Sequence, residues 1–111
     1  MSDLSKKTCK PCEGGVLPLN KEQIVSQLME IPKWQVDPTG IQRLFRIFEF
    51  KNYYQTMAFV NAVAWIAHSE NHHPDLEVGY NKCIVNYSTH AVKGLSLNDF
   101  ICAAKIDVLL P

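Results

Sequence analysis

The order in which helical and alternating apolar patterns follow one another constrains the fold of this chain more than any other feature. Apolar residues at helical spacing predict a helix over about 21–30, and Asn20 with Gln23 forms a capping-box pattern at its start. Aromatic and β-branched residues between turn signals then predict two strands, over 34–36 and 41–50. The turn sequence between these two strands indicates a hairpin.

A second helix and a second pair of strands follow in the same order. The helix is expected to begin after Asn52, to carry a wide apolar stripe and to end near Ser69, because Pro74 disfavours helical backbone before it. Strands are predicted over 76–80 and 83–88. Alternation within the second of these strands places three side chains on one face: Cys83, Val85 and Tyr87.

A third helix completes the pattern. Ser96 and Asp99 form another capping box at its start. Its buried stripe is expected to comprise Leu97, Ile101, Ala104 and Val108. The order helix, strand, strand, helix, strand, strand, helix predicts an α+β domain, with a small four-stranded antiparallel sheet and three helices packed on one face.

Composition bounds the domain organisation and the classes of partner. A length of 111 residues fits one domain, and we expect a flexible leader over 1–18 and a single folded domain over 19–111. Four residues disfavour regular structure in the leader: Pro11, Gly14, Gly15 and Pro18. Eleven basic and eleven acidic residues give a net charge of +0, without the basic excess typical of direct nucleic-acid binding. No apolar run approaches the roughly 18 residues of a membrane helix and no secretion signal is present, so a cytoplasmic protein without membrane contact is expected.

Four cysteines raise the question of a metal or redox site. Cys9 and Cys12 form a Cys-x-x-Cys motif in the leader, whereas Cys83 and Cys102 stand alone in apolar segments. A structural zinc commonly takes its soft ligands from two such pairs, and the second pair is missing. We therefore expect reduced, exposed thiols at Cys9 and Cys12, and no metal ion.

Three of the four histidines lie in the second strand–strand unit or at its entrance. His72 and His73 precede Pro74, and His90 follows the last strand. Imidazole titrates near neutral pH, so their convergence would indicate acid–base chemistry. Two alternatives remain open: a metal site, although adjacent His72 and His73 should point in different directions, and plain surface or capping histidines.

Three further residues have structural explanations. His68 falls at the end of the second helix, where a cation is favoured by the helix dipole. Asp99 is explained by its capping box. Trp34 is expected in the core, with its edge as a candidate wall of a ligand pocket.

Several motifs together resemble the pterin-4a-carbinolamine dehydratase family. They are Glu70-Asn71-His72-His73-Pro74-Asp75, then Ser88-Thr89-His90, and then Gly94-Leu95-Ser96-Leu97-Asn98-Asp99-Phe100. The resemblance spans about residues 9–109 and includes Cys12-Glu13-Gly14-Gly15 and Pro32-Lys33-Trp34. The pairing of His-His-Pro with a downstream Thr-His at this spacing is its most specific part.

This resemblance implies a hydro-lyase that converts 4a-hydroxytetrahydropterin to quinonoid dihydropterin and water without a cofactor. It also implies recycling of the pterin used by aromatic amino acid hydroxylases. By position, His72 and His90 correspond to the acid–base residues, with His73 beside them in the catalytic group. The residues that the resemblance places around the pterin are His73, Pro74, Thr89, Trp34 and Asp99.

The resemblance leaves the wider role open. Relatives form homodimers or homotetramers, and some act without catalysis as dimerisation partners and coactivators of a homeodomain transcription factor. A related pterin-handling role in molybdopterin metabolism is a further alternative. The chain departs from many relatives in having Ala91-Val92 where an acidic residue follows the Thr-His, which affects how His90 would be tuned.

Overall fold

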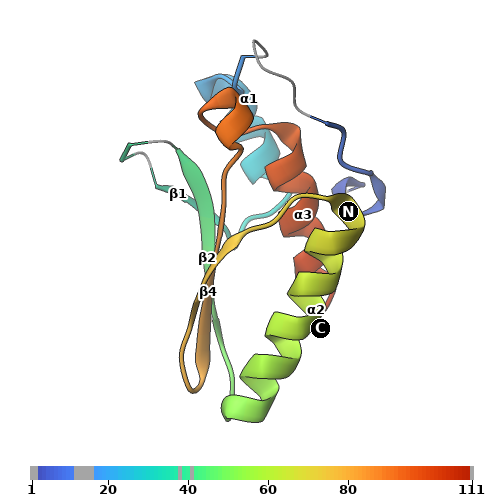
Figure 1. Cartoon of the computed structure of the whole chain (residues 1–111). Coiled ribbons are helices and arrows are strands. Elements are labelled where there is room, and N and C mark those ends of the chain that lie inside the picture. The colour runs from blue at the N-terminus through green and yellow to red at the C-terminus, as the bar shows by residue number, and fades with distance from the viewer. Residues whose placement is uncertain (1–2, 12–16, 38, 41, 111) are drawn as a thin grey trace.

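The fold is a single sheet with helices on one side of it. The computed structural model describes residues 3–11, 17–37, 39–40 and 42–110. The described elements are α1 (Lys21–Leu28), β1 (Gln35–Asp37), β2 (Arg43–Glu49), α2 (Tyr53–Glu70), β3 (Asp75–Val78), β4 (Lys82–Tyr87) and α3 (Leu97–Asp107), with short 3-10 helices η1 (Leu4–Lys6) and η2 (His90–Val92). All strand pairs are antiparallel, in the order β1-β2-β4-β3, and the helices lie on one side of the sheet (Figure 1). The predicted class and element order are confirmed.

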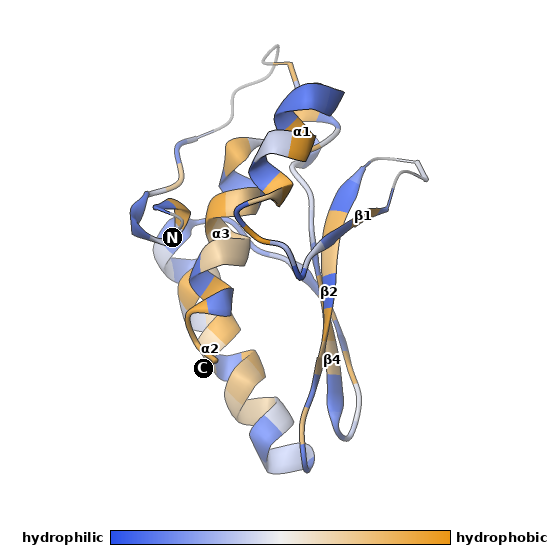
Figure 2. Ribbon diagram, turned by 180° about the vertical axis from the view of Figure 1, so that it is seen from behind, coloured by the Kyte–Doolittle hydropathy of each residue, from blue (hydrophilic) through white to orange (hydrophobic). Residues whose placement is uncertain are grey.

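The sheet has one buried face and one open face. On β4, Cys83, Val85 and Tyr87 are fully buried, as their alternation predicts. Leu44 of β2 pairs with Tyr87 and is also fully buried, whereas Ile47 of the same strand is 51% exposed on the opposite face. Figure 2 shows hydrophobic residues along the helices as well as the strands, so the core lies between α2, α3 and the sheet.

The predicted helix starts are confirmed by their hydrogen bonds. The Asn20 side chain accepts from the Gln23 backbone N–H at 2.8 Å, and the Gln23 side chain accepts from the Asn20 backbone N–H at 2.8 Å. Asn52 caps α2 in the same way. At α3 the Ser96 backbone N–H donates to Asp99 Oδ2 at 2.9 Å. Among the helices of the described part of the chain, none has the length and apolar character needed to cross a bilayer.

The N-terminal segment corrects one expectation. Residues 3–11 include the 3-10 helix η1 and pack against α3, whereas no regular structure was expected within 1–18. Leu4 is buried in the core. The side-chain amide of Asn98 accepts from the Lys10 backbone N–H at 3.0 Å and donates to the Lys10 carbonyl at 2.6 Å. The segment is therefore ordered by contacts with distant residues that local sequence does not reveal. Cys12 lies outside the described residues.

The end of α3 corrects a second expectation. Val108 was expected in the buried stripe, but α3 ends at Asp107, and Val108 is 70% exposed beyond it. The helical periodicity that predicts the stripe therefore holds only as far as the helix continues. The other three members of the predicted stripe lie within α3.

The two faces of β2 can be tested with a pair of truncations. Leu44→Ala removes a fully buried side chain and should lower the free energy of unfolding by about 2–5 kcal/mol. Ile47→Ala, on the open face of the same strand, should lower it by less than about 1 kcal/mol. Urea denaturation followed by circular dichroism measures both. Equal losses in the two variants would contradict the assignment of the faces.

Candidate active site

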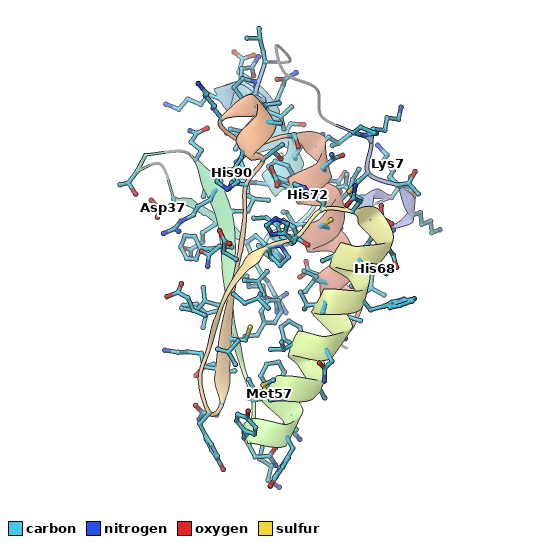
Figure 3. All side chains as sticks on the ribbon, viewed as in Figure 1. Lys7, Asp37, Met57, His68, His72 and His90 are labelled. Atoms are coloured by element: carbon cyan, nitrogen blue, oxygen red, sulfur yellow. The ribbon has the colours of Figure 1, made fainter. Side chains whose placement is uncertain are left out.

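Three of the predicted histidines line one cavity. The cavity has a volume of about 610 Å³ and is lined by residues that include His72, His73, Thr89 and His90. The lining also includes Cys9 and its neighbours in the N-terminal segment. Figure 3 shows His72 between the sheet and α3, and His90 beyond the end of β4. The structure thus brings together side chains that are up to 18 positions apart in the sequence.

The end of α2 sets the position of His72. Asn71 adopts the left-handed conformation with φ of 52°. The His72 backbone N–H donates to the Ala67 carbonyl at 3.0 Å, and the Asn71 N–H donates to the His68 carbonyl at 3.3 Å. These two bonds make a Schellman motif, which ends the helix and turns the chain towards β3. The Tyr87 hydroxyl also stabilises this turn, because it donates to the His72 carbonyl at 3.0 Å.

Asp99 anchors the His72 ring from the interior. Its side chain is fully buried, and Oδ1 accepts from His72 Nε2 at 2.6 Å. Its Oδ2 accepts from the Thr89 hydroxyl at 2.8 Å and from the Ser96 backbone N–H at 2.9 Å. The Ser96 hydroxyl, 2.7 Å from that of Thr89, completes the set by donating to it. A single carboxylate therefore acts as helix cap and as support for His72.

The surroundings of His72 favour its charged form. Burial lowers the pKa of the ring, but the hydrogen bond and negative charge of Asp99 outweigh this effect, so the pKa is raised above its usual value. The ring also stacks on Tyr87, with centroids 5.2 Å apart and planes at 20°. His72 is thus a fixed imidazole, with Nε2 bonded to Asp99, that favours the imidazolium form.

His73 and His90 are the exposed members of the site. His73 Nδ1 donates to the Pro74 carbonyl at 3.3 Å. His90 begins η2 directly after Thr89. Pro74 lines a separate hollow of about 390 Å³ beside α2, where His72 and His73 also contribute. The cavity therefore has one partly buried, anchored imidazole and two exposed ones, an arrangement suited to exchanging protons with a bound molecule.

Trp34 and His68 both lie outside the described lining of the 610 Å³ cavity. Trp34 is buried in the core and is absent from the described lining of the cavity, so the structure does not place it at the mouth. Its indole Nε1–H donates to Asp107 at 2.8 Å, and this bond holds the ring inside. His68 lies in the last turn of α2 against Trp65, as its structural explanation predicts.

Several residues at the site were not predicted from the sequence. Glu70 accepts from the Cys9 backbone N–H at 2.7 Å and so holds the N-terminal segment at the cavity. The side-chain amide of Asn98 holds the same segment by bonding to the backbone of Lys10. Tyr87 could have been found, because its alternation placed it on the buried face next to the His-bearing turn. No local signal marks Glu70 or Asn98, whose partners are more than 60 positions away.

The side chains that could bind a metal are dispersed. Within the described ranges, no three or more His, Cys, Asp or Glu side chains are placed to hold a metal ion together.

Comparisons with known proteins agree on one family. A family model described as pterin 4 alpha carbinolamine dehydratase matches residues 17–109. A protein of Nitrosomonas eutropha provisionally named a pterin-4-alpha-carbinolamine dehydratase is 61% identical over 109 residues, covering 97% of this chain and 94% of the relative. A protein of Legionella pneumophila strain Corby with the same provisional name is 61% identical over 111 residues, covering 98% and 96%.

Two solved structures share the fold. The transcriptional coactivator/pterin dehydratase of Brucella melitensis superposes with a TM-score of 0.79 at 24% identity, covering 85% of this chain and 99% of that one. A pterin dehydratase-like protein identified as a RuBisCO assembly factor of the alpha-carboxysome superposes with a TM-score of 0.60 at 24% identity, covering 69% and 88%. At this identity the likeness extends to the fold alone.

The contact between His72 and Asp99 makes stability depend on pH in a definite direction. The pKa of His72 is raised in the folded state. The stabilisation of the fold by charged His72 beside Asp99 is therefore fully present below about pH 6.5, and it is lost as pH rises through the folded pKa. We expect the Tm of His72→Gln to lie below that of the unmodified chain near pH 6, with the gap narrowing towards pH 9. Thermal unfolding at several pH values measures the gap, with His68→Gln as the control. A gap that is constant or widens towards pH 9 would contradict the contact.

Proposed function

The chain belongs to the pterin 4 alpha carbinolamine dehydratase family, and from this premise we propose that it dehydrates a 4a-hydroxytetrahydropterin to quinonoid dihydropterin and water. The observation that carries the proposal is the convergence of His72, His73 and His90 on one cavity, with His72 anchored by a buried carboxylate. The cavity volume of about 610 Å³ falls within the range of about 300–1,000 Å³ that is typical of small-molecule sites.

The reaction requires two proton transfers in opposite directions. The C4a–O bond breaks as its oxygen takes a proton and leaves as water. The proton on N5 is removed, and its electron pair forms the C4a–N5 double bond. Atoms and charge balance with one acid and one base, each of which typically contributes about 10²–10⁴-fold to the rate.

We assign the acid role to His72 and the base role to His90. Asp99 supports the imidazolium form of His72, which therefore has a proton to give near neutral pH. His90 is exposed at the rim of the same cavity, where it can take a proton from the ligand and pass it to water. His73 and Thr89 would hold the pterin between these two rings, and Asp99 is a positioning residue because it acts through His72.

The wider role we propose is recycling of the pterin used by aromatic amino acid hydroxylases, by a homodimer or homotetramer. Tyr54 and Trp65 on α2 are 81% and 67% exposed, which is apolar surface that a second copy could cover. The names of the two structural neighbours suggest coactivator and assembly roles as the alternative. A His72→Ala chain that still supplies the cellular function would favour that alternative.

Single histidine replacements test the proposed roles. Starting from chemically generated 4a-carbinolamine, we expect His72→Ala and His90→Ala each to slow dehydration by about 10²–10⁴-fold, because each removes one proton transfer. His68→Ala, on the same helix that leads to His72 but outside the 610 Å³ cavity, should retain the rate of the unmodified chain. Loss of the carbinolamine absorbance measures the rate. Near-normal turnover in both cavity variants would remove these residues from the mechanism.

The pH dependence of the rate provides a second test. The rate should fall on the alkaline side as His72 loses the proton that its raised pKa retains, and on the acid side as the base becomes protonated. Replacing Asp99 with Asn should move the alkaline limb to lower pH, because the charge that raises the pKa of His72 is removed. A flat profile between about pH 5 and pH 9 would be incompatible with an imidazole acid and base.

A further inference from the structure

Two thiols from opposite ends of the chain meet at the wall of the cavity. Cys9 of the N-terminal segment and Cys102 of α3 have sulfur atoms 3.6 Å apart, although they are separated by 93 positions in the sequence. This is contact distance for two unbonded sulfurs, and a disulfide needs about 2.05 Å. We propose that Cys9 and Cys102 are a redox pair, which a peroxide converts into a disulfide that ties the cavity wall to α3.

The surrounding contacts hold the pair in place. The Cys9 backbone N–H is bonded to Glu70 at 2.7 Å, and the next residue is clamped on both sides by the Asn98 amide. Asn98 and Cys102 lie one turn apart on the same face of α3. These bonds fix the position of Cys9 relative to α3 and so hold its sulfur beside that of Cys102.

Access to the pair is through the cavity. Cys9 is partly exposed and lines the cavity, whereas Cys102 is fully buried behind it. A small oxidant that enters the cavity therefore meets Cys9 first. Cys83, the other described cysteine, is fully buried on the sheet and is absent from the described lining.

The environment also favours the thiolate that such chemistry needs. The hydrogen bond from Cys9 lowers the pKa of Cys102 against the effect of burial, with help from the Tyr87 hydroxyl and the His72 charge. The same shared proton raises the pKa of Cys9. The contact therefore favours ionisation of Cys102 over that of Cys9.

The oxidation balances with two electrons and two protons. The pair first loses one proton, and the proton that remains passes to Cys102 as the Cys9 sulfur attacks the peroxide. The O–O bond breaks, one oxygen leaves with the lost proton as water, and Cys9 becomes a sulfenic acid. The Cys102 sulfur then attacks the Cys9 sulfur, the S–O bond breaks, and the second oxygen leaves as water with the remaining proton. Two thiols and one hydrogen peroxide become one disulfide and two water molecules.

The bond would draw the Cys9 part of the cavity wall towards α3. The sulfurs must approach from 3.6 Å to about 2.05 Å for it to form. The disulfide formation itself does not depend on the proposed dehydration, so a peptide-mapping test can fail or succeed independently of any activity assay.

Peptide mapping after oxidation tests the proposal. The reduced full chain is treated with a few equivalents of hydrogen peroxide, remaining thiols are alkylated in denaturant, and tryptic peptides are compared with and without reductant. Trypsin leaves Cys9 and Cys12 on one peptide, because Pro11 blocks cleavage after Lys10. The decisive sample is therefore Cys12→Ser, in which we expect a reducible link between residues 8–21 and 94–105 and an alkylated Cys83.

Stability gives a second readout. Oxidised Cys12→Ser should unfold at a Tm higher by about 5 °C or more, reversibly with dithiothreitol, because the bond closes a long loop. Cys9→Ser, which leaves the buried Cys102 in place, should show neither the link nor the shift. Full alkylation of Cys9 and Cys102 after peroxide treatment of Cys12→Ser, or a link from Cys9 to Cys83 instead, would overturn the proposal.

Discussion

The buried carboxylate of Asp99 is the contact on which the site depends. A fully buried carboxylate is costly unless it is hydrogen-bonded, and here His72, Thr89 and Ser96 supply the bonds. These partners belong to the turn after α2, the end of β4 and the start of α3. Satisfying one charge therefore fixes three segments relative to one another, and two of these segments carry the imidazoles that line the cavity.

The N-terminal segment forms the other wall by different means. It is attached through the carboxylate of Glu70 and the amide of Asn98, both of which bond to its backbone instead of its side chains. Residues 8–11 line the cavity but precede residue 17, where the match to the family model begins.

Much of the fold could be predicted from the sequence because its signals are local. Capping residues such as Asn20, alternation along β4 and the element order depend on neighbours a few positions apart, and all are confirmed. The contact of His72 with Asp99 spans 27 positions, so only the family resemblance placed both residues at one site. Trp34 lies in the core as expected but is absent from the described lining of the cavity, and the N-terminal segment contains a 3-10 helix where no regular structure was expected. Both outcomes depend on contacts with distant residues. Asp107 holds the indole inside, and Asn98 orders a segment whose composition resembles a leader.

The proposed function requires that His72, His73 and His90 surround a single bound pterin. Titration of the isotope-labelled protein with a stable dihydropterin, followed by the NMR signals of the four histidine rings, tests it most directly. We expect the signals of His72, His73 and His90 to shift along one common binding curve, whereas that of His68, on the last turn of α2 against Trp65, should stay nearly unchanged. Shifts confined to one ring, or a response at His68 equal to that of the others, would contradict it.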